Sequence, residues 1–275
     1  MSSPPGTSPP PEGQFPPPRP RRMKHFFTLL SHEIRMLLVS PSTYIAATAF
    51  LGFMGFIFVA ILENYSKAAQ DTAPAQVFFQ LYFLPVFFMV PLLTMKCLAE
   101  ERRLGTIETL LTTPVTTTEV VLGKFGAAYL LYMILWGSTG GFFYILKKFS
   151  SDPRLFDAGP LIGGYAFIAV SGLFFIAIGV FTSSFSRSQA VAGILSFVLL
   201  AALILGGSFL AKASFLDRES LQPLKDAVDY AQVTTHYEDF TRGVIDSRQL
   251  LFYLSGTVLA LIFSILSVEA KMLHG

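Results

Sequence analysis

The sequence predicts an all-α, polytopic membrane protein with six transmembrane helices. Only 14% of the 275 residues are charged, whereas a soluble domain usually carries about 25%. Charged residues are absent from six apolar windows, which contain no Asp, Glu, Lys or Arg. A hydrocarbon core about 30 Å thick requires about 20 apolar residues in a helix, and each window has about that length. The runs are continuous rather than alternating, as expected of buried helices.

The six windows define the predicted spans and the domain organisation. They are Thr43–Leu62, Val77–Met95, Phe125–Leu146, Ala158–Phe181, Ser188–Ala211 and Gln249–Val268. With their flanking turns we expect helices over about 43–62, 77–98, 121–146, 159–182, 188–211 and 249–270. We therefore predict one transmembrane domain over residues 23–275, preceded by a tail over residues 1–22.

The predicted tail is proline-rich and precedes an amphipathic segment. Nine of the seventeen prolines lie in the first twenty residues, a composition typical of disordered or polyproline II chain. Two interpretations stay open for it, a solvated tail and a docking arm for a partner domain. No apolar h-region marks it as a signal peptide.

Residues Lys24–Val39 favour a helix that lies in the membrane interface. Apolar side chains recur there at helical spacing, and polar side chains line the other side. The apolar positions are Phe27, Leu30, Ile34, Leu37 and Leu38, and the polar ones are Lys24, Thr28, His32 and Arg35. The pair Ser40-Pro41 predicts the end of this helix. The alternative is a plain continuation of the first span.

The segment Lys96–Lys124 predicts a structured helical elbow between spans two and three. Pro114 divides it into two helices. The first carries the charged run Glu100, Glu101, Arg102 and Arg103, followed by Gly105. The second begins with a capping box, in which Thr116 caps the helix and Glu119 follows three residues later. The elbow is either a solvated turn or a docking element for a cytoplasmic partner.

Flanking charge predicts that both termini lie in the cytoplasm. With the N-terminus inside, the inner segments hold eleven of the twenty Lys and Arg residues but seven of the eighteen acidic ones. The long segment Lys212–Arg248 then lies outside, where we expect short helices with Tyr237, Phe240 and Val244 as an apolar stripe. In span three, Gly137 and Gly141 form a GxxxG spacing, which serves either a subunit interface or packing within the chain.

Several function classes lack their usual signatures. The net charge of +2 provides no basic face for nucleic acid, and one cysteine with four scattered histidines gives no metal-ligand motif. No ionisable residue lies inside the six windows, unlike typical ion-coupled transporters. No GxSxG elbow and no GxxxxGK[ST] loop occurs. Energy for active transport would therefore come from another polypeptide.

The elbow resembles the cytoplasmic loop of ABC-2 type transporter permeases. That family shows an acidic and basic run, a Gly-Thr-hydrophobic-Glu-x-Leu-Leu stretch, a proline and a Gly-Lys pair that opens the third span. The matching residues here are Glu101, Gly105, Thr106, Glu108, Leu110, Leu111, Pro114, Gly123 and Lys124. The interfacial helix and six spans extend the resemblance over Met23–Gly275, and His236–Leu254 is similar to gliding-motility-type permeases of that family.

The resemblance implies a permease subunit, dimerised with an identical or related permease, in a cell (inner) membrane exporter. It implies that a separate ABC ATPase subunit binds ATP and that this chain needs no cofactor. The ATPase contact would be the elbow, through Glu100, Glu101, Arg102, Arg103, Gly105, Thr106, Glu108, Leu110, Leu111 and Pro114. The lipid contact would be the interfacial helix, through Phe27, Leu30, Ile34 and Leu37. The alternatives are a non-transporting membrane scaffold and a membrane-embedded enzyme.

Overall fold

The computed structural model describes residues 22–67, 72–105, 116–150, 155–211, 222–244 and 246–272, in which the elements are α-helices and no strand occurs. The predicted proline-rich tail lies outside these ranges, apart from its last residue. The helices are α1 (Arg22–Val39), α2 (Pro41–Lys67), α3 (Pro74–Gln80), α4 (Phe83–Thr94), α5 (Ala99–Leu104), α7 (Thr117–Ser138), α8 (Gly140–Phe149), α9 (Ala158–Phe185), α10 (Gln189–Ala211), α11 (Gln222–Tyr230), α12 (Val233–Thr241) and α13 (Ser247–Met272).

The six predicted spans are confirmed as helices long and apolar enough to cross a membrane. Within the described ranges these are Pro41–Lys67, Phe83–Leu104, Thr117–Phe149, Ala158–Phe185, Gln189–Ala211 and Ser247–Ala270. The second begins later than predicted, because the chain turns at Leu81 and Tyr82 between α3 and α4. Pro85 explains the break, since it has no N–H to donate to the Leu81 carbonyl and lies instead in the first turn of α4, where that bond is not needed.

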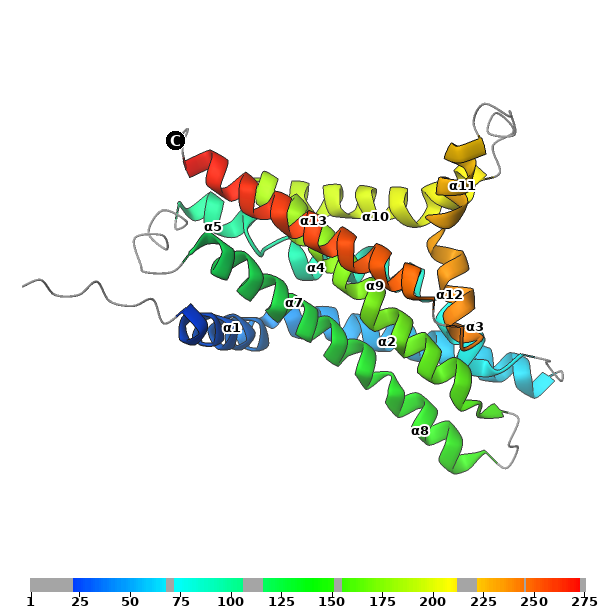
Figure 1. Cartoon of the computed structure of the whole chain (residues 1–275). Coiled ribbons are helices and arrows are strands. Elements are labelled where there is room, and N and C mark those ends of the chain that lie inside the picture. The colour runs from blue at the N-terminus through cyan, green and yellow to red at the C-terminus, as the bar shows by residue number, and fades with distance from the viewer. Residues whose placement is uncertain are drawn as a thin grey trace, which may run out of the picture.

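The bundle has two distinct ends (Figure 1). Helices α1 and α5 and the C-terminus of α13 lie at one end, which we call the elbow end. Helices α3, α11 and α12 gather at the other, the far end. The two ends of the described chain therefore lie on the same side of the bundle, as an even number of spans requires. The cytoplasmic assignment of that side stays a prediction.

Helix α9 is the centre of the bundle, and its glycines allow close approach. It packs against α13, α10, α12, α7, α4 and α3. A Cβ on Gly163 would overlap the Phe240 carbonyl, and one on Gly179 would overlap the Thr94 side chain. Gly164 and Gly172 make similar approaches to the rings of Phe79 and Tyr132. Small residues let helices pack in this way without a hydrophobic driving force between them.

The predicted GxxxG pair behaves differently from these glycines. Gly137 and Gly141 are exposed, and a Cβ on either would meet no atom of the described residues within 4 Å. Among those residues, packing within the chain, one of the two interpretations of this spacing, is therefore wrong. The close intrachain approaches belong to α9, where Gly163 has the same GxxxG spacing to Gly159 but was not singled out from the sequence.

A chain of hydroxyl groups crosses the apolar interior near the α3–α4 break. The Tyr82 Oη lies 2.7 Å from the Ser171 Oγ and 3.3 Å from the Tyr132 Oη. Ser171 donates in turn to the Phe167 carbonyl at 2.7 Å. All three hydroxyl-bearing residues are buried. Because an unpaired polar group is costly in an apolar interior, this chain fixes α4 and α7 against α9.

The far end is closed by the short helices predicted for the segment after span five. Tyr237 of α12 donates to the Gln76 carbonyl of α3 at 2.7 Å, and Phe240 is buried beside it. Val244, predicted to continue this apolar stripe, is instead 57% exposed. It lies beyond the C-terminus of α12, which ends at Thr241, so helical spacing no longer applies to it.

Buried His236 joins α11, α12 and α13. Its Nε2 donates to the Tyr230 carbonyl at 2.8 Å, because a carbonyl can only accept, and its Nδ1 lies 3.1 Å from the Tyr253 hydroxyl. Burial lowers the pKa of His236 below its ordinary value, although the Tyr230 carbonyl and the charges of Asp239 and Asp246 act in the opposite direction. The imidazole is therefore neutral in the folded protein at neutral pH.

We predict that Gly163→Ala destabilises the bundle by about 1–3 kcal/mol, the usual cost of overpacking. The added methyl would meet the backbone carbonyl of Phe240, which cannot rotate away as a side chain could. Thermal unfolding of the detergent-purified chain measures the effect. Gly137→Ala is the matched control, because nothing lies within 4 Å of its Cβ position. Equal unfolding temperatures for the two variants would contradict the close approach.

We also predict that the far end loosens in mild acid. The unfolded chain binds a proton at His236 more readily than the folded chain does, because the folded-state pKa is lowered. The stabilising contribution is therefore complete above the ordinary histidine pKa of about 6.5 and decreases as the pH falls through that value. Unfolding temperatures at pH 7.5 and 5.5 test this. The decrease should be smaller in His236→Gln and unchanged in His32→Gln, whose parent side chain is exposed.

Candidate functional site

The first helix of the predicted elbow is held by the end of α9. The backbone N–H groups of Leu98 and Ala99 both donate to the Ser183 Oγ, each at 3.0 Å. Ser183 donates in turn to the Met95 carbonyl at 3.3 Å and is completely buried. A single serine of α9 thus satisfies two amides at the start of α5, which otherwise lack partners at a helix N-terminus.

Helix α5 ends at Gly105, which has a left-handed backbone with φ of +68°. Glycine adopts this conformation without the Cβ clash that other residues meet, and it commonly terminates helices in this way. The remaining predicted elbow residues, Thr106, Glu108, Leu110, Leu111 and Pro114, lie outside the described residues.

The second helix of the elbow begins as predicted. The Thr116 Oγ1 accepts from the Glu119 N–H at 3.3 Å, and the Glu119 Oε2 accepts from the Thr116 N–H at 2.9 Å. Both halves of the capping box are therefore present. This cap fixes the start of α7 at Thr117 and places Lys124 about two turns into the helix.

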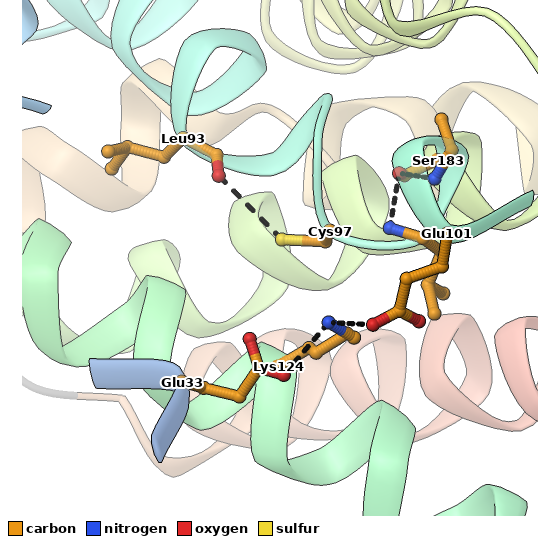
Figure 2. Close-up of polar contacts among 8 residues, drawn as sticks. Glu33, Leu93, Cys97, Glu101, Lys124 and Ser183 are labelled. Atoms are coloured by element: carbon orange, nitrogen blue, oxygen red, sulfur yellow. Dashed lines mark hydrogen bonds and ion pairs between the residues drawn. The ribbon is translucent and has the colours of Figure 1, made fainter. Parts of the chain in front are cut away.

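Lys124 lies between two carboxylates from distant segments (Figure 2). Its Nζ is 2.9 Å from the Glu33 Oε1 of α1 and 2.7 Å from the Glu101 Oε1 of α5. The side chains are 7%, 18% and 19% exposed for Lys124, Glu33 and Glu101, respectively. We call these three residues the ion cluster. It joins α1, α5 and α7 at the elbow end.

The ion cluster is stable only as a unit. A buried ammonium group loses its hydration and must recover that free energy from charged partners at close range. Removing Lys124 would take away the ammonium group that lies 2.9 Å from the Glu33 carboxylate and 2.7 Å from the Glu101 carboxylate.

A second contact ties α5 to the last span. The guanidinium of Arg102 donates to the Ser267 carbonyl of α13 at 3.2 Å. The Ser267 hydroxyl donates to the Ser184 carbonyl of α9, also at 3.2 Å. The charged run predicted from the sequence is therefore divided between two sides of α5. Glu101 and Arg102 point into the bundle, whereas Arg103, Leu104 and Gly105 are exposed.

Helix α1 packs against α7 beside the ion cluster. A Cβ on Gly123 would lie 3.1 Å from the Leu29 Cδ2, and one on Gly126 would lie 3.1 Å from the Leu30 Cδ1. The predicted apolar face of α1 is thus divided. Leu30 is half-buried and Leu37 packs against the core, whereas Phe27 is 62% exposed. That exposed edge suits an interfacial position, which stays a prediction.

Ser183 and the pairing of Lys124 with Glu33 and Glu101 were not predicted from the sequence. One signal was available for Glu33, which lies three residues after Leu30 and four before Leu37. An acidic residue at helical spacing inside an apolar face needs a buried partner. Ser183 gave no comparable signal, because the short polar run Thr182–Arg187 is an ordinary turn composition.

The contacts of the ion cluster connect helices α1, α5 and α7. Among the described residues, no group of three or more His, Cys, Asp or Glu side chains is arranged to hold a metal ion. The Cys97 thiol lies beside the ion cluster in Figure 2 and donates to the Leu93 carbonyl at 3.7 Å. The charged groups of the cluster contact each other, and their arrangement joins helices.

Comparison with known proteins agrees with the resemblance. Residues 58–269 match the family model described as ABC-2 family transporter protein. The match begins at Phe58, in the last part of α2, covers the next four spans completely and ends at Glu269, near the end of α13. None of the curated proteins compared with the chain matches it.

We predict that Lys124→Gln destabilises the chain by about 3 kcal/mol. Breaking a buried ion pair usually costs 3–5 kcal/mol, and the partial exposure of both glutamates places this cluster at the lower end. Thermal unfolding in detergent measures the loss. Lys67→Gln is the matched control, because Lys67 pairs with Glu63 on the surface, where such pairs contribute about 0.5 kcal/mol. A Lys124→Gln chain as stable as this control would show that the ion cluster does not hold the helices together.

Proposed function

The chain belongs to the ABC-2 transporter family, as a multi-pass permease component, and from that premise we propose that a separate ATPase subunit drives it as an exporter. We place the complex in the cell (inner) membrane, with two permease subunits enclosing the transport path between them. ATP is bound by the ATPase subunits. The elbow of α5 and the segment after it forms the ATPase contact.

The anchoring of α5 is the observation that carries this proposal. One side of the helix is fixed inside the bundle by the ion cluster, by Ser183 and by Arg102. The other side presents Arg103 and Leu104 outward at the elbow end, and Leu104 is 60% exposed. Because the bundle holds the opposite side of α5, a partner bound to this exposed apolar residue and its charged neighbour can transmit force into the bundle.

The contacts of α5 define how a displacement would spread. Movement of α5 reaches α7 and α1 through Lys124, α9 through Ser183, and α13 through Arg102. Helix α9 then carries it to α10 and α12, which pack along it. Because packed helices respond as rigid bodies rather than deforming continuously, a push on the elbow tilts the bundle as a whole. Tilting of two such bundles opens and closes the transport path between them.

The structure changes which residues we assign to the ATPase contact. The resemblance implied that Glu101 and Arg102 belong to the ATPase contact, but their described contacts lie within the chain. We therefore assign them to transmission. Glu100, Arg103, Leu104 and the segment from Thr106 to Pro114 supply the contact itself.

We predict that Leu104→Asp lowers co-purification of the ATPase about tenfold, the effect of losing one well-packed interface residue. The full chain is purified in mild detergent, and co-purifying proteins are identified and tested for ATP hydrolysis. Val244→Asp is the matched control, because Val244 is comparably exposed at the far end. Unfolding temperatures of both variants should equal that of the wild type.

Three results would contradict the proposal. If no ATPase co-purifies with the wild type, the permease has no such partner. If Leu104→Asp and Val244→Asp retain equal amounts of ATPase, the contact lies elsewhere. If an ATPase binds through the elbow but the permease never alters its hydrolysis rate, the chain serves as a scaffold instead of a driven permease.

A further inference from the structure

An apolar groove runs along the membrane-facing surface between α2 and α4. Its volume is about 320 Å³. Ala46, Ala49 and Phe53 of α2 line one wall, and Pro85, Phe88 and Leu92 of α4 line the other. At 1.5 Å per residue, the wall from Pro85 to Leu92 is about 10 Å long, which suits the middle part of one hydrocarbon chain. The alanines on α2 and the missing turn before Pro85 leave this space unfilled.

A cationic and hydroxylic cluster lies beyond the elbow end of the groove. Lys96 follows Leu92 by four residues, and Ser42 precedes Ala46 by four, so both lie about one turn past the apolar walls. The Lys96 Nζ donates to the Ser42 Oγ at 3.1 Å, and Ser42 lies 2.8 Å from the Ser40 Oγ. Among the described residues, no carboxylate forms an ion pair with Lys96. Its charge thus lacks a counter-ion within this part of the chain.

We propose that the groove and this cluster together bind one anionic membrane phospholipid. The phosphate accepts hydrogen bonds from the Lys96 ammonium and the serine hydroxyls, and one acyl chain lies in the groove. The order of the parts supports this assignment. The polar cluster is at the elbow end of the span, where headgroups lie, and the apolar walls follow it toward the membrane interior.

A second copy of the chain fits the groove less well. A twofold interface centred here would place identical surfaces opposite each other, so two Lys96 side chains would approach the same axis. Like charges brought together in a low-dielectric setting repel. A phospholipid instead supplies the opposite charge and a flexible chain that follows a narrow groove. The lipid site shares no residue with the proposed ATPase contact.

The test is native mass spectrometry of the detergent-purified full chain after addition of phosphatidylglycerol or phosphatidylcholine. The wild type should retain phosphatidylglycerol in preference to phosphatidylcholine. Lys96→Gln should lower retention of phosphatidylglycerol about fivefold, the effect expected of one lysine near an anionic headgroup. Ala49→Trp should lower retention of both lipids, because the indole fills the groove without changing any charge.

Two controls separate a specific site from general effects. Lys67→Gln removes an exposed lysine at the far end of α2, and Ala202→Trp adds an indole on the exposed face of α10. Both should retain lipid as the wild type does. Equal loss in Lys96→Gln and Lys67→Gln, or full retention by Ala49→Trp, would overturn the proposal. A dimer that dissociates in Ala49→Trp without loss of lipid would overturn it too and assign the groove to a second copy.

Discussion

A buried ammonium group organises the elbow end of this protein. Lys124 enters an apolar bundle about two turns after the start of α7, and its charge is acceptable there only because Glu33 and Glu101 approach it. The three residues lie on three different helices, and nothing in their local sequences fixes how these helices pack against one another. Pairing them fixes the angle between α1 and α7 and holds α5 against both. The electrostatic requirement of one lysine therefore sets the geometry of the segment that we assign to the ATPase contact.

The apolar interior follows a different rule, in which close packing replaces charge. Helix α9 approaches its neighbours closely at glycines. The hydrogen bonds from Tyr132 through Tyr82 to Ser171 also hold α4 and α7 against it in one orientation. Apolar surfaces gain little from leaving lipid for protein. Shape and hydrogen bonding therefore decide which helix faces α9. A rigid centre of this kind lets movement at one end of the bundle reach the other.

Local features of the sequence predicted much of this structure. The six spans could be recognised because hydropathy is a property of each window alone, and the capping box at Thr116 because its two residues are close in the chain. The break before Pro85 has a local cause, the loss of one backbone N–H. The start of the second span was predicted too early, because its apolar window also includes part of α3, a separate short helix at the far end of the bundle (Figure 1).

The contacts that define the site could not be predicted in the same way. Glu33 and Lys124 are separated by 91 positions, and Ser183 and Leu98 by 85. Nothing in either neighbourhood specifies the distant partner. The same limit explains the outcome for GxxxG. Its spacing is a local pattern, but whether a small face meets another helix depends on the whole bundle, and Gly137 meets none within the described chain.

The central position of α9 also bears on how the chain assembles during synthesis. It is the fourth of the six spans, so α2, α4 and α7 are made before the helix that receives them. Until α9 arrives, Thr94 and Tyr132 have no glycine surface to pack against, and Tyr82 lacks its serine acceptor. Helix α13, which packs along α9, is made last of all. The early spans therefore lack their contacts with α9 until it is inserted, and the native packing around α9 is complete only after α13 has been made.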